Sequence, residues 1–192
     1  MDNYCRGFAL HKHRPLTLHA TIEIPPVGED ESEAVAIRGL LYLSNLFRTI
    51  DDKFSRVWNT ARSECSPTWL ADLQRQLTEA LPPELNCTEA QEADIRITQQ
   101  WLRIVVWQMS TASGCLSSSS PDAFMSFTYP IDVSKEVVDI TRQLSQRALE
   151  VHGIGLVRSN IRQKSRSSDS LVDREVIRCG LYPHRCHVLR AH

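Results

Sequence analysis

The chain has 192 residues and a formal net charge of −1, which is the size of one ordinary domain. Hydrophobic residues make up 42% and charged residues 23%, so the composition excludes collagenous and disordered chains and permits a buried core. No apolar run is longer than that from Ile104 to Trp107, which is far short of the roughly 20 residues that span a bilayer. We therefore expect no membrane helix, and residues 1–10 lack the apolar stretch of a signal peptide.

Residues 1–31 are expected to form an irregular segment with one short extended stretch at Thr21–Pro25, where polar and apolar residues alternate. Apolar residues then recur at spacings of three and four from Ile37 to Val57. This spacing predicts one continuous amphipathic helix from about Ser32 to Ala61.

A second helix is predicted to begin at Ser66-Pro67, because serine caps a helix and proline lacks only an N–H that would have no partner there. The pair Pro82-Pro83 is expected to end it. Its buried face is predicted to carry Trp69, Leu70, Leu73, Leu77 and Leu81.

A third helix is predicted to open with a capping box formed by Thr88 and Gln91. Its apolar stripe is expected to comprise Ile95, Thr98, Leu102, Val105, Val106 and Met109, flanked by Trp101 and Trp107. After a polar serine loop, a fourth helix is predicted to run from a cap at Asp132 to Val151 and to end at His152-Gly153.

These patterns predict an all-α fold, a bundle of about four amphipathic helices in residues 32–153. Residues 154–192 show no sustained period, are rich in serine and arginine, and are expected to be a disordered tail. From residue 155 onward eight basic and three acidic residues give +5, which leaves −6 for the rest of the chain. Because an acidic body repels phosphates, we expect no direct sequence-specific DNA binding from it.

The cysteines are the first candidates for chemistry. All six are expected to be reduced thiols, four of them small packing residues, since no export signal is visible. Cys115 follows Ser113-Gly114, which is not a nucleophile elbow, so a packed thiol at a helix end is favoured over a nucleophile. Cys179, His184, Cys186 and His187 crowd into nine residues, a spacing unlike the two separated pairs of a zinc site.

Other candidate motifs also favour structural interpretations. Gly153-Ile154-Gly155 follows a helix and lacks the third glycine of a phosphate loop, so it is interpreted as a helix terminator. The carboxylates at Glu29–Glu33 and Asp51-Asp52 are interpreted as solvated faces. Arg158–Arg166 is interpreted as a solvated, disordered end, with a weak polyanion or nuclear-import site as the alternative. The four tryptophans are expected in helix packing, with a small-ligand cavity as the alternative. We therefore expect no catalytic, cofactor-binding or metal-binding residue, and no enzyme.

The string Arg14-Pro15-Leu16-Thr17-Leu18, followed by Ile22-Glu23-Ile24-Pro25, resembles the R-P-x-x-I … I-x-x-P passage of fungal zinc-cluster (Gal4-type) transcription factors, in their regulatory or middle homology domain. The order that follows is also similar to that domain. It comprises a helix around Leu40–Trp58, the Trp69–Leu77 helix closing on Leu81-Pro82, a long helix through Gln99–Arg103, and an amphipathic stretch at Val137–Leu149.

The resemblance covers residues 15–153 and implies a helical fragment of a larger regulatory domain that acts in the nucleus, in factors that often control secondary-metabolite gene clusters. The family's zinc cluster begins with C-x-x-C, which this chain lacks. The family's further R-P string is replaced by Met109–Gly114, and the chain turns polar after Leu156. We therefore expect a truncated member without the zinc-cluster DNA-binding module.

Three functions remain open at this stage. The first is a transcription-regulator-like module that binds a protein partner, such as a full-length zinc-cluster regulator, and leaves room for a small-molecule effector. The second is a stand-alone helical interaction scaffold with no transcriptional role. The third is an enzyme with an unrecognised site.

Overall fold

The computed structural model describes residues 6, 7, 9, 10, 12, 14, 30–59, 65–118 and 122–151. Of this described part 76% is helical and none is strand, so the expected all-α bundle is confirmed. From residue 30 onward the described residues form six α-helices where about four were predicted, because two predicted helices are each divided. They are α2 (Glu31–Arg48), α3 (Asp52–Asn59), α4 (Pro67–Glu79), α5 (Glu89–Ala112), α6 (Tyr129–Gln143) and α7 (Gln146–Val151), with one 3-10 turn, η2 (Ala123–Met125).

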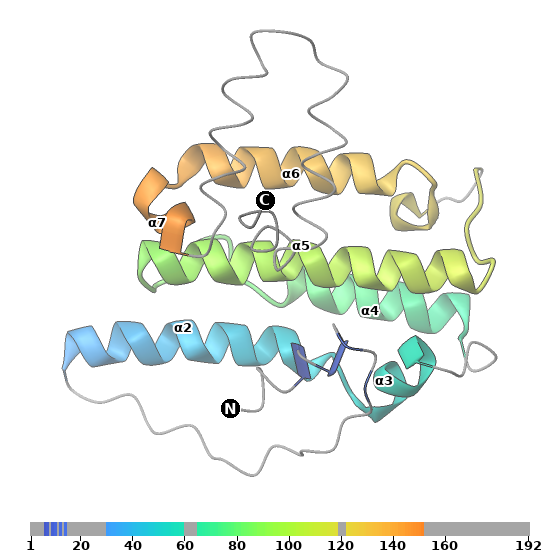
Figure 1. Ribbon diagram of the computed structural model, residues 1–192, viewed down its shortest axis with the longest axis horizontal. Coiled ribbons are helices and arrows are strands. Elements are labelled where there is room, and N and C mark those ends of the chain that lie inside the picture. The colour runs from blue at the N-terminus through green and yellow to red at the C-terminus, as the bar shows by residue number, and fades with distance from the viewer. Residues whose placement is uncertain are drawn as a thin grey trace, which may run out of the picture.

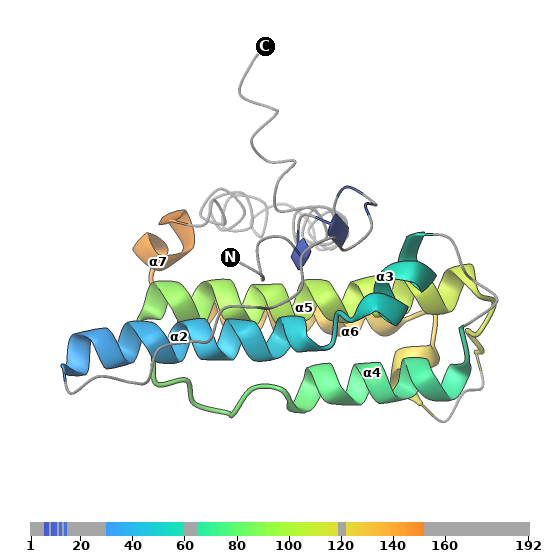
Figure 2. The same ribbon diagram turned by 90° about the horizontal axis from the view of Figure 1, so that it is seen from below.

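Helix α5 is the centre of the bundle and is covered on several sides (Figure 1). Helices α4 and α6 pack against it in the opposite direction, and α2 runs beside it in the same direction (Figures 1 and 2). The main core cluster joins α2, α3, α4 and α5, and its fully buried side chains include Leu46, Ile50, Phe54, Leu70 and Leu102. A smaller cluster of Ala93, Leu144, Ala148 and Leu149 fixes α7 to the start of α5.

Both predicted helix starts in the middle of the chain are confirmed. The Ser66 hydroxyl accepts a hydrogen bond from the Trp69 amide at 3.3 Å, with proline in the first turn of α4. At α5 the Thr88 hydroxyl accepts from the Gln91 amide at 3.3 Å, and the Gln91 side chain accepts from the Thr88 amide at 3.2 Å. These local signals place α4 and α5 because caps satisfy amides that have no partner inside the helix.

The prediction of one continuous first helix is wrong, because the helix is interrupted between α2 and α3. The Thr49 hydroxyl donates to the Leu46 carbonyl at 2.8 Å and closes α2, and the Asp51 carboxylate accepts from the Phe54 amide at 2.7 Å and caps α3. Ile50 between them is fully buried, so the apolar stripe continues through the break. Periodicity alone therefore concealed the interruption.

The prediction for the fourth helix, a cap at Asp132 and a continuous run to Val151, was also wrong on both points. The helix begins at Tyr129, with proline in its first turn, and Asp132 is an exposed residue paired with Lys135 at 3.0 Å. It is then interrupted at Leu144, whose φ of −93° and ψ of 149° are extended, before α7 begins. The predicted end at His152-Gly153 lies outside the described residues.

The N-terminal segment differs from the expected irregular one, because residues 6, 7, 9, 10 and 12 have helical backbone. The Arg6 guanidinium donates to the Phe47 carbonyl in the last turn of α2 and to the Ile50 carbonyl just beyond it, where a positive charge is favoured by the helix dipole. Leu10 is buried in the main core, and its carbonyl accepts from the Trp58 indole at 3.0 Å. The predicted stretch at Thr21–Pro25 and the tail at 154–192 lie outside the described residues.

Candidate functional site

Polar side chains from three helices, four of them buried and one exposed, meet between α4, α5 and α6. Gln74 comes from α4, Gln100 and Arg103 from α5, and Tyr129 and Glu136 from α6. Buried polar groups cost free energy unless they are hydrogen-bonded, so such a group is either a structural network or a functional site. We refer to these five residues as the polar network.

Arg103 is the hub of the polar network. Its Nε donates to the Tyr129 hydroxyl at 2.9 Å, and its Nη1 donates to Gln100 Oε1 at 2.7 Å. Its two terminal nitrogens bind both carboxylate oxygens of Glu136, the second at 3.2 Å. This two-pronged arrangement is the strongest pairing that a guanidinium makes with a carboxylate.

A closed ring of hydrogen bonds links the same centre to α4. The Tyr129 hydroxyl donates to Gln74 Oε1 at 3.1 Å, and Gln74 Nε2 donates to the Arg103 carbonyl at 2.8 Å. Each polar atom of the Gln74 side chain therefore has a partner. The ring ties α4, α5 and α6 together through groups that apolar packing alone would leave unpaired.

The electrostatics fix the protonation states at neutral pH. Burial by itself lowers the pKa of Arg103, but the hydrogen bonds and charge supplied by Glu136, with those of Tyr129, outweigh it and raise the pKa above its ordinary value. Burial raises the pKa of Tyr129, and the neighbouring Arg103 only partly opposes this. Arg103 is thus a permanent cation, and Tyr129 is a neutral hydroxyl that donates a proton in a hydrogen bond.

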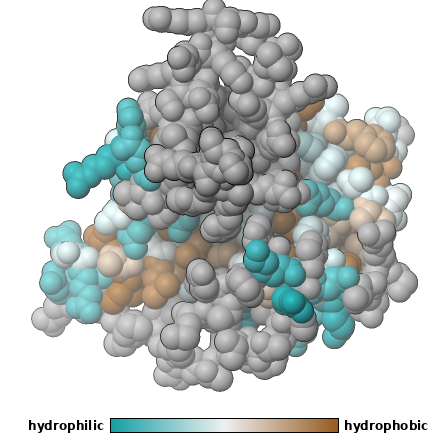
Figure 3. Space-filling model, in the orientation of Figure 1, coloured by the Kyte–Doolittle hydropathy of each residue, from teal (hydrophilic) through white to brown (hydrophobic). Residues whose placement is uncertain are grey.

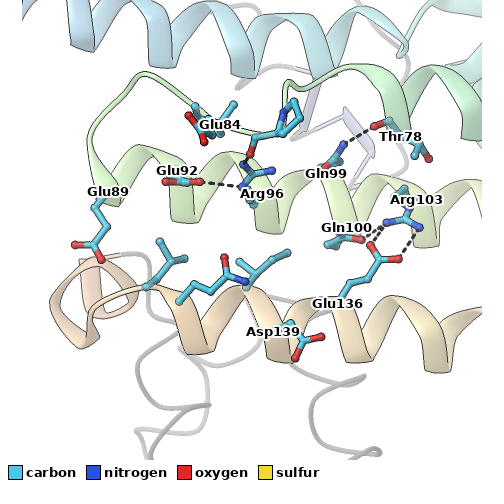
Figure 4. Close-up of a pocket in the computed structure, with 15 residues that line it drawn as sticks. Thr78, Glu84, Glu89, Glu92, Arg96, Gln99, Gln100, Arg103, Glu136 and Asp139 are labelled. Carbon is cyan, nitrogen blue, oxygen red and sulfur yellow. Dashed lines mark hydrogen bonds and ion pairs between the residues drawn. The ribbon is translucent and has the colours of Figure 1, made fainter.

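The polar network opens on one side into a groove of about 820 Å³ (Figure 4). The Arg103 side chain is 10% exposed, whereas that of Glu136 is 46% exposed, so the carboxylate forms the solvent-facing end. The remaining lining comes from the end of α4, the α4–α5 connection, the first turns of α5 and the facing side of α6: Thr78, Pro83, Glu84, Leu85, Glu89, Glu92, Arg96, Gln99, Gln100, Asp139, Ile140, Gln143 and Leu144.

The charged groups of the groove are largely engaged with one another. Arg96 pairs with Glu92 at 2.9 Å and also donates to the Pro83 carbonyl. Glu89 accepts from the Ser145 amide at 2.5 Å and the Ser145 hydroxyl at 2.7 Å, and these bonds lower the pKa of Glu89. The groove therefore offers intramolecular pairs that hold α4, α5, α6 and α7 in place.

Reaction chemistry would need a nucleophile beside a base, or groups that converge on a substrate. The polar network contains a cation, a hydroxyl, two amides and one paired carboxylate, and its hydrogen bonds run from helix to helix. All seven histidines of the chain fall outside the described residues. Within those residues, no group of three or more His, Cys, Asp or Glu side chains is placed to hold a metal ion.

Three cysteines lie in the described part, and each is half-buried against the main core cluster: Cys65, Cys87 and Cys115. Burial raises the pKa of Cys87 and of Cys115, so both favour the neutral thiol. The Cys115 sulfur contacts the Ser113 carbonyl at 3.7 Å. This placement fits the packed thiol that the sequence favours for Cys115.

The four tryptophans are half-buried, and none of them lines the groove. Trp107 donates from its indole to the Ser126 carbonyl at 3.0 Å, and Trp69 meets Phe54 edge to face at 6.5 Å. Trp101 packs against the main core, as Trp58 and Trp69 do. Their surroundings fit the helix-packing interpretation.

Several candidate residues from the sequence lie away from the polar network or outside the described residues. Asp51 and Asp52 are exposed, and Asp51 serves as a cap. Asp30 caps α2, and Glu31 and Glu33 are exposed in its first turn. Outside the described residues lie Glu29, Gly153–Gly155, Arg158–Arg166, Cys179, His184, Cys186 and His187. Sequence reasoning missed the polar network, although Gln99, Gln100 and Arg103 interrupt an otherwise apolar region of α5 and were a usable signal.

The chain matches no protein-family model, no curated protein and no solved structure. Among the described helices, none has the length and hydropathy needed to cross a membrane.

Proposed function

We propose that this chain is a regulatory or interaction module that acts through contacts with another protein and catalyses no reaction of its own. In line with the sequence resemblance, it acts in the nucleus as a transcription-regulator-like protein, without reading DNA directly, and serves the control of a secondary-metabolite gene cluster. One observation carries the proposal. The polar side chains that meet between α4, α5 and α6 bond to one another, so they join helices and are not directed at a substrate.

The positions of the packing motifs support the resemblance to the zinc-cluster regulatory domain. Residues 40–48 and 52–58 fall on α2 and α3, and Trp69–Leu77 falls on α4. The string Gln99–Arg103 lies in α5 and supplies the hub of the polar network, and Val137–Leu149 covers most of α6 and enters α7. Each helical motif that carries the resemblance is therefore in or across a helix of one bundle, whereas Pro15–Leu18 and Ile22–Pro25 lie outside the described residues.

Two exposed apolar side chains give a location for the contact. Phe127 is 60% exposed and Ile131 is 44% exposed, whereas most large apolar side chains of the described part are covered. Phe127 lies two residues before α6 and Ile131 lies in its first turn, and Figure 3 shows hydrophobic surface at the end of the bundle where η2 meets α6. Neighbouring exposed apolar groups of this kind are typical of contact sites between proteins.

The lining of the groove favours protein contacts over the sensing of a small molecule. Sites for small molecules are lined mainly by apolar and aromatic side chains. This groove has only four apolar lining residues among fifteen, and five carboxylates and two arginines that are largely paired. A small-molecule effector therefore has less support than a protein partner.

A cellular experiment tests the proposal. A tagged copy is expected to accumulate in the nucleus of the native host, and deletion is expected to change the transcript levels of a gene cluster. In the deletion strain, the double variant Phe127→Glu and Ile131→Glu is expected not to restore the transcript levels. The variant Gln76→Glu, which adds a carboxylate at an exposed position of α4, is expected to restore them.

A tagged copy outside the nucleus, together with unchanged transcripts, would overturn the transcriptional role and favour the stand-alone scaffold. Duplex DNA provides a second test. If the purified chain shifted duplex DNA at physiological salt with a sequence preference, the proposal that it does not read DNA would be wrong.

A further inference from the structure

Cys65 and Cys115 lie at the same end of the bundle. Cys65 immediately precedes Ser66, the cap of α4, and Cys115 comes three residues after the end of α5. Because α4 and α5 pack side by side in opposite directions, the start of one lies beside the end of the other (Figure 1). Residues 50 positions apart in the chain are thereby brought together.

The two thiols share the same surroundings. Both are half-buried and pack against the main core cluster of α2, α3, α4 and α5. Cys115 is held in place by the helix end: its amide donates to the Ser110 carbonyl at 2.9 Å, and Gly114 before it has a φ of +67°. A left-handed residue with this bond is a standard way to end a helix, and it fixes the direction of the next side chain.

A negative charge on Cys65 would oppose ionisation of Cys115. The pKa of Cys115 is raised first by burial and second by the negative charge that a Cys65 thiolate would carry. Cys87 provides a contrast, because its pKa is raised by burial and by Glu92, with no cysteine contributing. The two sulfurs near the α4–α5 end are therefore close enough to influence each other.

We propose that Cys65 and Cys115 are an oxidisable pair that forms an intramolecular disulfide, which fastens the start of α4 to the end of α5. The oxidant is a small disulfide of the glutathione class. One cysteine thiolate attacks the oxidant, forms a mixed disulfide and releases one thiol. The other cysteine then attacks the sulfur of the first and releases the second thiol. Two electrons and two protons pass from the cysteine pair to the oxidant, and the step balances.

The test uses the full chain, reduced and then equilibrated at low protein concentration with oxidised glutathione. Trypsin cleaves after lysine and arginine and leaves each of the six cysteines on a different peptide. Mass spectrometry without reduction is expected to find the peptide 63–75 joined to the peptide 104–135. The oxidised monomer is expected to unfold at a higher denaturant concentration than the reduced one, because a crosslink restricts the unfolded chain.

Variants separate this pair from general thiol oxidation. Cys65→Ser and Cys115→Ser are each expected to abolish the joined peptides and the shift in unfolding midpoint, and Cys87→Ser is expected to keep both. If Cys65 or Cys115 pairs first with another cysteine, or if both remain free while the oxidant is in excess, the proposal is wrong. Since the peptide map of the unaltered chain decides this, a variant that fails to fold does not affect the outcome.

Discussion

Gly39 in the middle of α2 allows the side chain of Gln91 to lie against that helix. A Cβ added at this position would come within 2.8 Å of Gln91 Oε1 and closer still to its Cδ and Nε2. Gln91 is not free to move, because it accepts from the Thr88 amide at 3.2 Å and donates to the Ala36 carbonyl at 3.0 Å. Gly39→Ala would therefore displace a side chain that joins the start of α5 to α2.

Whether Gly39→Ala stabilises or destabilises the fold depends on whether the gain in helix propensity exceeds the cost of displacing Gln91. Replacing a glycine inside a helix by alanine stabilises by about 1 kcal/mol. Displacing Gln91 costs about 1 kcal/mol for the capping box and about 1 kcal/mol for the bond to α2. Gly39→Ala alone is therefore expected to lower the free energy of unfolding by about 1 kcal/mol.

A double-mutant cycle isolates this cause. With Gln91→Ala already present, the three nearest atoms are gone, and Gly39→Ala is expected to raise the free energy of unfolding by about 1 kcal/mol. The coupling between the two positions is then about 2 kcal/mol, measured by urea unfolding of the four proteins followed by circular dichroism. If Gly39→Ala has the same effect in both backgrounds, the contact with Gln91 does not explain the glycine.

Three further predictions concern the site, the pH response and the core. Glu136→Ala is expected to lower the free energy of unfolding by about 2 kcal/mol, because it leaves the largely buried Arg103 cation without its counter-charge. The lowered pKa of Glu89 means that its bonds stabilise the fold at neutral pH, and this contribution is lost as the pH falls through that lowered value. Glu89→Gln is therefore expected to lower the unfolding midpoint at pH 7 and to lose that effect as the pH falls through the lowered pKa of Glu89. Leu102→Ala, at a fully buried position, is expected to cost about 2–5 kcal/mol in urea unfolding.

Each of these predictions has a control or an outcome that contradicts it. Asp139→Ala removes an exposed pair with Arg142 and is expected to change stability by less than about 0.5 kcal/mol. A loss as large as that of Glu136→Ala would show that burial of the cation is not the reason. If the difference in unfolding midpoint between the unaltered chain and Glu89→Gln grew on acidification, the expected pH dependence would be wrong in sign. Leu40→Ala, at a position that is 43% exposed, is expected to cost far less than Leu102→Ala.

Features that depend on neighbours in sequence were predictable. The caps at Ser66 and Thr88 are made by residues within three positions, so their residue types alone indicated where α4 and α5 begin. The helical periodicity that identified the bundle is local in the same sense. The all-α class followed from these patterns without any knowledge of which helices touch.

The features that were missed depend on residues far apart in the sequence, or on a helix interruption across which the apolar period continues. Ser145, immediately before α7, is bound to Glu89, which lies 56 positions earlier, and the pair Arg103–Glu136 spans 33 positions. No local pattern shows that these residues meet. At the other break the buried Ile50 keeps the apolar period intact, so only Asp51 indicated a new helix start.

The first two turns of α5 hold three other segments at once. Gln91 bonds to α2, Glu89 bonds to the residue that begins α7, and Arg96 bonds to the connection that follows α4. Opening these turns would release all three segments together, so the backbone amides around them are expected to exchange with solvent as one cooperative unit. This end of the molecule should therefore open as a whole, and no one of its peripheral segments should come away alone.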